Sequence, residues 1–406
     1  MSTPGNDLRK MQAESDAEKT RLVGHHDLNG SGDGMQVVKH GKYLYVAHVG
    51  QSKMALSILD VSDPSNPRLL RQIPHAPNTH NHKVQIVGDV LVQNSEFISY
   101  LPITGSEKPV AGLNVYSIED PENPQQIGFY PVGERGVHRT WYREAPYAHI
   151  AAPVEGCSSR GYHIVDLSDP AHPKRAGCWW VPGSKAGDSN PWEALDPVQN
   201  KLAVHGVIPR GDRAYASCTD GGMAILDISD MSCPKLISRI NWCPPYGGYS
   251  HTSLPLPGRG LLVEVCEWVN GGRERNGDKR IWLLDIREER QPVMISSFPL
   301  PKPPKNSPWR SFHDRPLKFG PHNVHENYRN GFQSETLIFS TWFNAGLRIT
   351  DISDADQPTE VGHFVPPAPA GQEAPQINDL YVDKDNLVYL TDRVSGGLYI
   401  VEHRCG

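Results

Sequence analysis

Short apolar strands alternate with turns along most of the chain, and one phrase of this kind recurs. The stretch "ALSILDVSDPSNPRLLRQI" at residues 55–73 returns in altered form at residues 112–130, 161–179, 222–240, 280–298 and 346–364, with a shortened copy at 397–406. Each copy predicts a strand, a turn and a second strand. Asp at the strand end can accept hydrogen bonds from turn amides, and Pro removes a backbone donor where the chain reverses.

Another predicted strand pair precedes each phrase, as in "MQVVKHGKYLYVAHV" at residues 35–49. Four strands per unit, at a period of about 50 to 65 residues, are typical of a β-propeller. We therefore predict an all-β fold, a seven-bladed β-propeller. The last copy lacks its outermost strand, and residues 18–30 contain an isolated strand. We expect this N-terminal strand to close the last blade, because closure leaves no open sheet edge.

The predicted domains are an N-terminal tail at residues 1–17 and a single propeller domain at residues 18–406. The "ILDVSDP" type of phrase resembles the LVIVD repeat over nearly the whole chain. This resemblance implies a propeller-like fold. It implies little about function, because propellers carry many chemistries as well as plain binding surfaces.

Histidine opens many of the strands that would line the channel of such a propeller. When the repeats are aligned on their turn glycines, histidines fall at or near one shared position in five of the seven: His82, His138, His205, His251, and His322 with His325. The whole chain has only 18 histidines. Neutral imidazoles that converge on one axis form a nitrogen-rich site suited to a transition metal. For any single histidine, hydrogen bonding at a wet channel mouth is the alternative.

We predict one ion on the propeller axis with four imidazole ligands, which are His82, His205, His251 and His322. Carboxylates at the ends of neighbouring strands would orient these rings from behind: Glu96, Glu267, Asp220 and Asp379. Capping of a turn is the alternative for each carboxylate, above all for Asp220, because two glycines follow it.

Two long connections, residues 181–201 and 299–327, are predicted to be lids, because long structureless loops are uncommon in compact domains. The catalytic roles are assigned to His138, His325, His313 and Arg315. The substrate pocket is assigned to Trp268, Trp309, Trp342 and Arg393. Such aromatic side chains suit a flat, largely apolar substrate, although the tryptophans could instead hold the lids down.

Composition narrows the classes of partner. Charged residues make up 21% of the chain, the net charge is −6 and basic runs are absent, so we expect no nucleic-acid partner. No stretch is apolar enough for a membrane span or a signal peptide. The seven cysteines are odd in number and contain no CxxC pair, which indicates free thiols. We expect a cytoplasmic protein that acts on a small-molecule substrate.

Four histidines with outer carboxylates resemble the non-haem iron centre of carotenoid-cleaving oxygenases, which are also seven-bladed propellers. This resemblance is one of site and architecture. It implies Fe(II), with Mn, Zn or Cu as alternatives, and an oxygenase or oxidase acting on a small unsaturated or aromatic compound. A metal-dependent lyase or hydrolase acting on a carboxylate or lactone is the second hypothesis. A non-catalytic scaffold for protein partners is the third.

Overall fold

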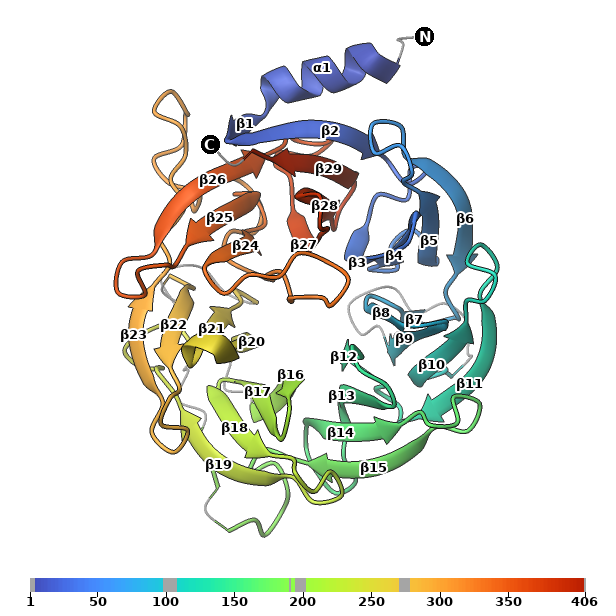
Figure 1. The fold of residues 1–406 in the computed structure, drawn as a ribbon, viewed down its shortest axis with the longest axis vertical. Coiled ribbons are helices and arrows are strands. Elements are labelled where there is room, and N and C mark those ends of the chain that lie inside the picture. The colour runs from blue at the N-terminus through green and yellow to red at the C-terminus, as the bar shows by residue number, and fades with distance from the viewer. Residues whose placement is uncertain (1–3, 98–107, 190, 194–201, 270–277, 405–406) are drawn as a thin grey trace. The chain divides into compact units, whose positions relative to one another are not determined.

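The structure is a computed structural model, and it describes residues 4–97, 108–189, 191–193, 202–269 and 278–404. The chain divides into two compact units, and Figure 1 labels the elements of both. Unit 1 comprises residues 1–74 and 296–406, and unit 2 comprises residues 75–295. Nearly all regular structure is strand, which confirms the predicted all-β class; α1 (Pro4–Glu14) is an α-helix and η1 (Pro257–Arg259) a 3-10 helix. Within the described residues, no helix has the length and apolar character needed to cross a bilayer.

The described residues of unit 1 form three antiparallel four-stranded sheets. The first joins β3 (Gly34–His40), β4 (Tyr43–His48), β5 (Met54–Asp60) and β6 (Arg68–Pro74). The second joins β27 (Ile377–Val382), β28 (Leu387–Asp392), β29 (Gly397–His403) and β2 (Thr20–His26). The third joins β24 (Leu337–Thr341), β25 (Leu347–Asp351), β26 (Thr359–Val365) and β1 (Asp16–Glu18).

The N-terminal segment supplies an edge strand to two of these sheets. β2 runs antiparallel to β29, with Thr20 opposite His403 and His26 opposite Leu398, so the predicted N-terminal strand does complete the last sheet. β1 pairs with β26, which the sequence did not predict. The predicted boundary between residues 17 and 18 falls inside β1. The assignment of residues 18–406 to a single domain stays a prediction.

Unit 2 contains one five-stranded, one four-stranded and one eight-stranded sheet among its described residues. The five-stranded sheet holds β7 (Thr79–His80), β8 (Val84–Val87), β9 (Val90–Phe97), β10 (Gly112–Ser117) and β11 (Gln125–Pro131). The four-stranded sheet holds β12 (Arg139–Trp141), β13 (Tyr147–Pro153), β14 (Arg160–Asp166) and β15 (Lys174–Trp179).

The eight-stranded sheet consists of two four-stranded runs. These are β16 (Leu202–Arg210), β17 (Arg213–Thr219), β18 (Met223–Asp227) and β19 (Lys235–Ile240), then β20 (Ser250–Leu256), β21 (Leu261–Cys266), β22 (Ile281–Asp285) and β23 (Val293–Ser297). A single pair, Thr219 opposite Ser250, connects the two runs. The count of seven blades stays a prediction.

The recurring Asp does what the sequence predicts at the turn between paired strands. Asp60 Oδ1 accepts the Ser62 amide at 2.9 Å, and Arg68 donates to Asp60 Oδ2 at 2.8 Å. The side-chain and amide bonds from Ser62 lower the pKa of Asp60. The same amide bond, two residues on, recurs at Asp166, Asp227, Asp285 and Asp351. The phrase therefore encodes one local hydrogen-bonding unit.

A buried chain of hydrogen bonds links three segments of unit 1. His48 Nδ1 lies 2.7 Å from Asp33 Oδ1, and His48 Nε2 lies 2.7 Å from Ser57 Oγ. Gln72 Nε2 also donates to Ser57 Oγ, at 3.1 Å. The groups occur in the order of a hydrolase triad. However, Asp33, His48 and Ser57 are at most 2% exposed, so a substrate cannot reach Ser57. These hydrogen bonds therefore have a structural role.

Candidate metal centre

Five histidines form a continuous row in unit 2. His80 ends β7, His82 follows it, His138 precedes β12, His205 lies in β16 and His251 lies in β20. Ring centroids along this row are separated by 4.4, 5.3, 4.6 and 4.1 Å. The rings meet because β12 packs beside β16, and β16 beside β20 (Figure 1). The structure therefore brings together four of the histidines that the repeat alignment selects, and it adds His80.

Two of these histidines lie at irregularities in the strand pairing. Between β16 and β17 the register shifts between Leu202 and Gly206, and His205 lies inside that shift. Between β20 and β21 the register shifts between Ser250 and Thr252, and His251 is the residue in between. Such bulges re-aim a side chain out of the regular alternation of a strand. This explains locally why both imidazoles turn towards the row.

Glu96 holds two of the rings from behind. Its Oε2 accepts hydrogen bonds from His80 Nε2 and from His138 Nδ1, both at 2.8 Å, and its Oε1 accepts one from Arg160 at 3.3 Å. Burial would raise the pKa of Glu96, but the contacts with His138 and His80 outweigh burial and hold that pKa well below its usual value. Glu96 is therefore an ionised acceptor at neutral pH.

The hydrogen bonds fix which nitrogen carries the proton in two rings. His138 Nδ1 donates to Glu96, and His205 Nδ1 donates to the carbonyl oxygen of His251 at 3.0 Å. The lone pairs of both rings are then on Nε2, and these two Nε2 atoms lie only 2.9 Å apart. Burial, followed by the charge of Arg160, lowers the pKa of His138 to about 4. Burial likewise lowers the pKa of His205 well below its usual value, so at neutral pH a proton between the rings is disfavoured.

His82 has the opposite arrangement. The Asn94 side chain accepts the Lys83 amide at 2.7 Å through its oxygen, so its nitrogen is the group that faces His82 Nδ1 at 3.1 Å. An amide nitrogen can only donate, so His82 Nδ1 accepts and its proton lies on Nε2. This tautomer favours hydrogen bonding over metal ligation for His82.

Two groups in unit 2 could hold a metal ion. One is His80, His82 and Glu96, and the other is His205, His251 and Glu267; in each group the ligand atoms lie within 4.8 Å of one another. Two histidines with one carboxylate form a ligand set used by non-haem Fe(II) enzymes. His138 is the most exposed ring of the row, with 22% of its side chain accessible, whereas the other four residues are at most 5% exposed. Solvent therefore reaches the row at His138.

Buried cations accompany the histidines, and sequence reasoning missed them. Lys83 and Arg139 are 3% and 5% exposed, and both contribute to lowering the pKa of His205, after burial. Arg139 Nη1 lies 3.3 Å from His251 Nδ1. The arginine crosses β16 at Gly206, where a Cβ would lie 2.5 Å from Arg139 Cδ. Lys83 and Arg139 adjoin histidines in the sequence, and that adjacency was the available signal.

The remaining predicted ligand and its neighbours lie in unit 1. His322 Nδ1 donates to the Asn378 carbonyl oxygen at 2.6 Å. His325 accepts the Phe339 amide on Nδ1 at 3.1 Å and bonds Asn327 Oδ1 through Nε2 at 3.0 Å. Both nitrogens of His325 are thus used locally, which favours a structural role over the predicted catalytic one. The assignment of His322 to the same ion stays a prediction.

The other predicted site residues occupy varied surroundings. Asp220, Asp379 and Trp342 are at most 3% exposed, and Trp342 donates to Ser340 Oγ at 3.0 Å within unit 1. Asp379 accepts the Leu380 amide at 2.9 Å. Trp309 and Arg315 line a cavity of about 210 Å³ in unit 1. The rest are half-buried: Trp268, His313, whose ring lies 4.5 Å from that of Phe319, and Arg393, which lies 5.8 Å from the Phe343 ring.

Comparison with known proteins identifies the repeat. A family model described as "LVIVD repeat" matches residues 31–73, 156–178, 204–241 and 341–365. The chain carries LVIVD repeats. The matched LVIVD segments coincide with four of the copies found in the sequence. No curated protein sequence matches the chain.

Solved structures similar to this LVIVD-repeat chain are β-propellers, which confirms the predicted propeller class but not the predicted count of seven blades. The WD40 repeats of RRP9 align over 96% of this chain and 100% of theirs, with 10% identity and a TM-score of 0.59. The periplasmic gluconolactonase PpgL of Pseudomonas aeruginosa aligns over 89% of this chain and 96% of its own, with 11% identity and a TM-score of 0.58. At these identities the likeness extends to the fold alone.

Replacing Glu96 with Gln tests the role of the carboxylate behind the rings. Gln keeps an acceptor but loses the charge, so we expect metal affinity to fall by about 10- to 100-fold without vanishing. Competition with a chelator of known affinity measures this change, with Glu134→Gln, an exposed residue of unit 2, as the matched control. Complete loss of the ion would make Glu96 a ligand, and an unchanged affinity would remove it from the site.

Proposed function

We propose that this protein is a metal-dependent enzyme whose ion is bound by the histidine row of unit 2. The observation that carries this proposal is the 2.9 Å between the Nε2 atoms of His138 and His205, both of which present lone pairs. Two lone pairs at this distance repel each other, and a shared cation removes the repulsion. His138 then acts as a ligand and not in the separate catalytic role that the sequence analysis assigns to it.

The same distance favours one class of ion. Two imidazole nitrogens about 2.1 Å from one ion, and 2.9 Å from each other, subtend an angle of about 90°. That is the angle between adjacent ligands of an octahedral ion, and it is smaller than the tetrahedral angle typical of structural Zn²⁺. Glu267 or His251, which group with His205, would supply the third ligand. With Glu267 as the third ligand, the site has two histidines and one carboxylate, a set that suits Fe(II) or Mn(II).

The reaction that we propose for this enzyme is that of an oxygenase or oxidase acting on a small unsaturated or aromatic compound. A ligand set of this kind leaves positions on the ion for substrate and O₂, and the exposure of His138 gives them a route to it. When bound, the ion would supply the redox chemistry. The chain itself would orient the rings through Glu96 and the His251 carbonyl, and would exclude water on the side of His205 and His251.

A second candidate is a metal-dependent hydrolase or lyase acting on a carboxylate or lactone. The buried cations Lys83 and Arg139 support it, because they can stabilise an anionic substrate or product beside the ion. One of the similar structures is a gluconolactonase, which carries only the likeness in fold. The identity of the metal separates the two candidates.

Elemental analysis of the full chain, purified without added metal, tests the proposed function. We expect about one equivalent of iron or manganese, which a chelator removes and the same metal restores. Iron favours the oxygenase, and manganese or zinc favours the hydrolase or lyase. A protein that neither retains nor rebinds a transition metal would contradict the proposal and favour the non-catalytic scaffold.

A further inference from the structure

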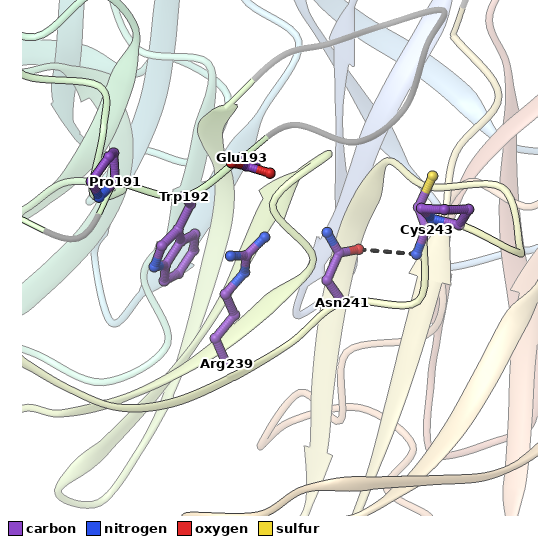
Figure 2. A pocket seen from close by; sticks show the side chains of 7 residues that line it. Pro191, Trp192, Glu193, Arg239, Asn241 and Cys243 are labelled. Carbon is purple, nitrogen blue, oxygen red and sulfur yellow. Dashed lines mark hydrogen bonds between the residues drawn. The ribbon is translucent and has the colours of Figure 1, made fainter.

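A cavity in unit 2 lies apart from the histidine row. It has a volume of about 480 Å³, which is in the range of small-molecule sites. Figure 2 shows the side chains that line it: Pro191, Trp192, Glu193, Arg239, Asn241, Cys243 and Pro244. None of the five row histidines lines this cavity.

Arg239 is the residue of this cavity whose charge would be stabilised by a bound anion. Its guanidinium lies 4.2 Å from the centre of the Trp192 ring, and its Nε donates to the Gly221 carbonyl oxygen at 2.6 Å. Within the described part of the chain, no carboxylate forms an ion pair with it. Arginine stays charged in proteins, and half-burying that charge without an anion is costly. Its remaining N–H groups are therefore available to an anion in the cavity.

The apolar surface of the cavity lies beside the charge and is held in place. The Trp192 amide donates to the Pro182 carbonyl oxygen at 2.9 Å, and the Trp192 and Trp179 rings lie 6.0 Å apart. Gly221 also leaves room for the indole, because a Cβ there would lie 3.2 Å from Trp192 Cε3. Trp192 thus forms a fixed surface, to which Pro191 adds.

The other polar groups of the cavity limit what can bind. The side-chain nitrogen of Asn241 donates to the Asp220 carbonyl oxygen at 3.0 Å, and its side-chain oxygen accepts the Cys243 amide at 3.1 Å. Arg239 is therefore the principal group for recognition. Glu193 is exposed and also lines the cavity, and its charge would repel a second negative group on a ligand.

We propose that this cavity binds a small monocarboxylate with an apolar body. The carboxylate pairs with the guanidinium fork of Arg239, since arginine binds carboxylates through two parallel hydrogen bonds. The apolar body packs against Trp192 and Pro191, as apolar ligand surface does in most pockets. This site is independent of the metal proposed above, because no histidine of the row lines the cavity.

Titration calorimetry of the metal-free full chain with benzoate tests this proposal. We expect saturable binding of benzoate, and at least 10-fold weaker binding of benzamide, which has the same shape without the charge. Arg239→Gln should weaken benzoate binding by about 10- to 100-fold, in line with the loss of a charged hydrogen bond. Arg290→Gln, a change at an exposed arginine of unit 2, should leave it unchanged.

Two further variants sharpen the test. One shows whether benzoate binding depends on the charge of Arg239 or on its forked shape, and the other shows whether benzoate binds in the cavity or at the histidine row. Arg239→Lys keeps the charge but loses the fork, so it should bind benzoate with intermediate affinity; it also replaces Arg239→Gln in the test if that variant unfolds. His205→Ala should bind benzoate as well as the unaltered chain does. Loss of binding in His205→Ala with retention in Arg239→Gln would place the anion at the histidine row and overturn the proposal. So would equal affinity for benzoate and benzamide, or no binding at millimolar concentrations.

Discussion

Replacement of His205 with alanine is expected to abolish metal binding while the fold persists. His205 belongs to the group with His251 and Glu267, and its Nε2 also faces that of His138. Both of these ligand sets include His205, so removal of its ring takes a ligand from either one. The side chain lies in a register shift and not in the regular ladder, so we expect a stability loss of only about 1–2 kcal/mol.

The measurement is metal content by elemental analysis, with thermal melting to show that the chain is folded. His172→Ala is the matched control, because His172 is an exposed histidine of unit 2 whose side chain bonds Asp169 at the surface. It should keep the full metal content. A His205→Ala protein that retains as much metal as the control would contradict the assignment of the site.

His82→Ala separates the two ligand sets. The four-histidine centre predicted from the sequence includes His82, and its loss there would remove the ion. In the set favoured by the hydrogen bonds, His82 accepts from Asn94 and is not a ligand, so the variant should keep most of the metal. Metal content after dialysis distinguishes these outcomes.

His48→Ala is expected to have the largest effect on stability. The substitution removes the ring between Asp33 and Ser57, leaves both with a lost hydrogen bond in a buried environment and opens a cavity in unit 1. Together the lost hydrogen bonds and the cavity should lower the free energy of unfolding by about 3 kcal/mol or more. Urea denaturation should show a lower midpoint of unfolding, whereas His172→Ala should change stability by no more than about 0.5 kcal/mol.

Replacing Ser57 tests whether the chain of Asp33, His48 and Ser57 is structural. Ser57→Ala should lower stability without changing any hydrolytic activity of the protein, because no substrate reaches the buried Ser57. Thermal melting and an ester-hydrolysis assay on the same preparation measure the two effects. A Ser57→Ala protein with unaltered stability that has lost a hydrolytic activity of the unaltered chain would instead assign a catalytic triad to unit 1.

The strand and turn pattern was accessible from the sequence because it depends on local rules. The bond from Asp60 to the amide of Ser62 spans two residues, and its recurrence at the other copies follows directly from the repeated letters. The pairing of β2 with β29 was predictable as well, because an incomplete last unit and an isolated first strand complement each other. β1 was not predicted, since three residues carry too little pattern.

The positions of the histidines were likewise predictable, but their chemistry was not. Repeat alignment placed His82, His138, His205 and His251 at the starts of neighbouring strands, and the structure does bring these rings together. Which nitrogen faces which depends on partners from other sheets, such as Glu96 for His138. The register shifts that aim His205 and His251, and the passage of Arg139 over Gly206, are also set by pairing between distant segments.

The sequence by itself therefore determined the repeating strands, the turns between them and the N-terminal closing strand, because each depends on residues that are close in the chain or repeated along it. Only the tertiary structure decided that His138 and His205 share a 2.9 Å contact, that His325 is satisfied within its own unit and that Arg239 lies on Trp192. Those facts depend on distances and proton positions between separate strands, which the local pattern of side chains does not determine.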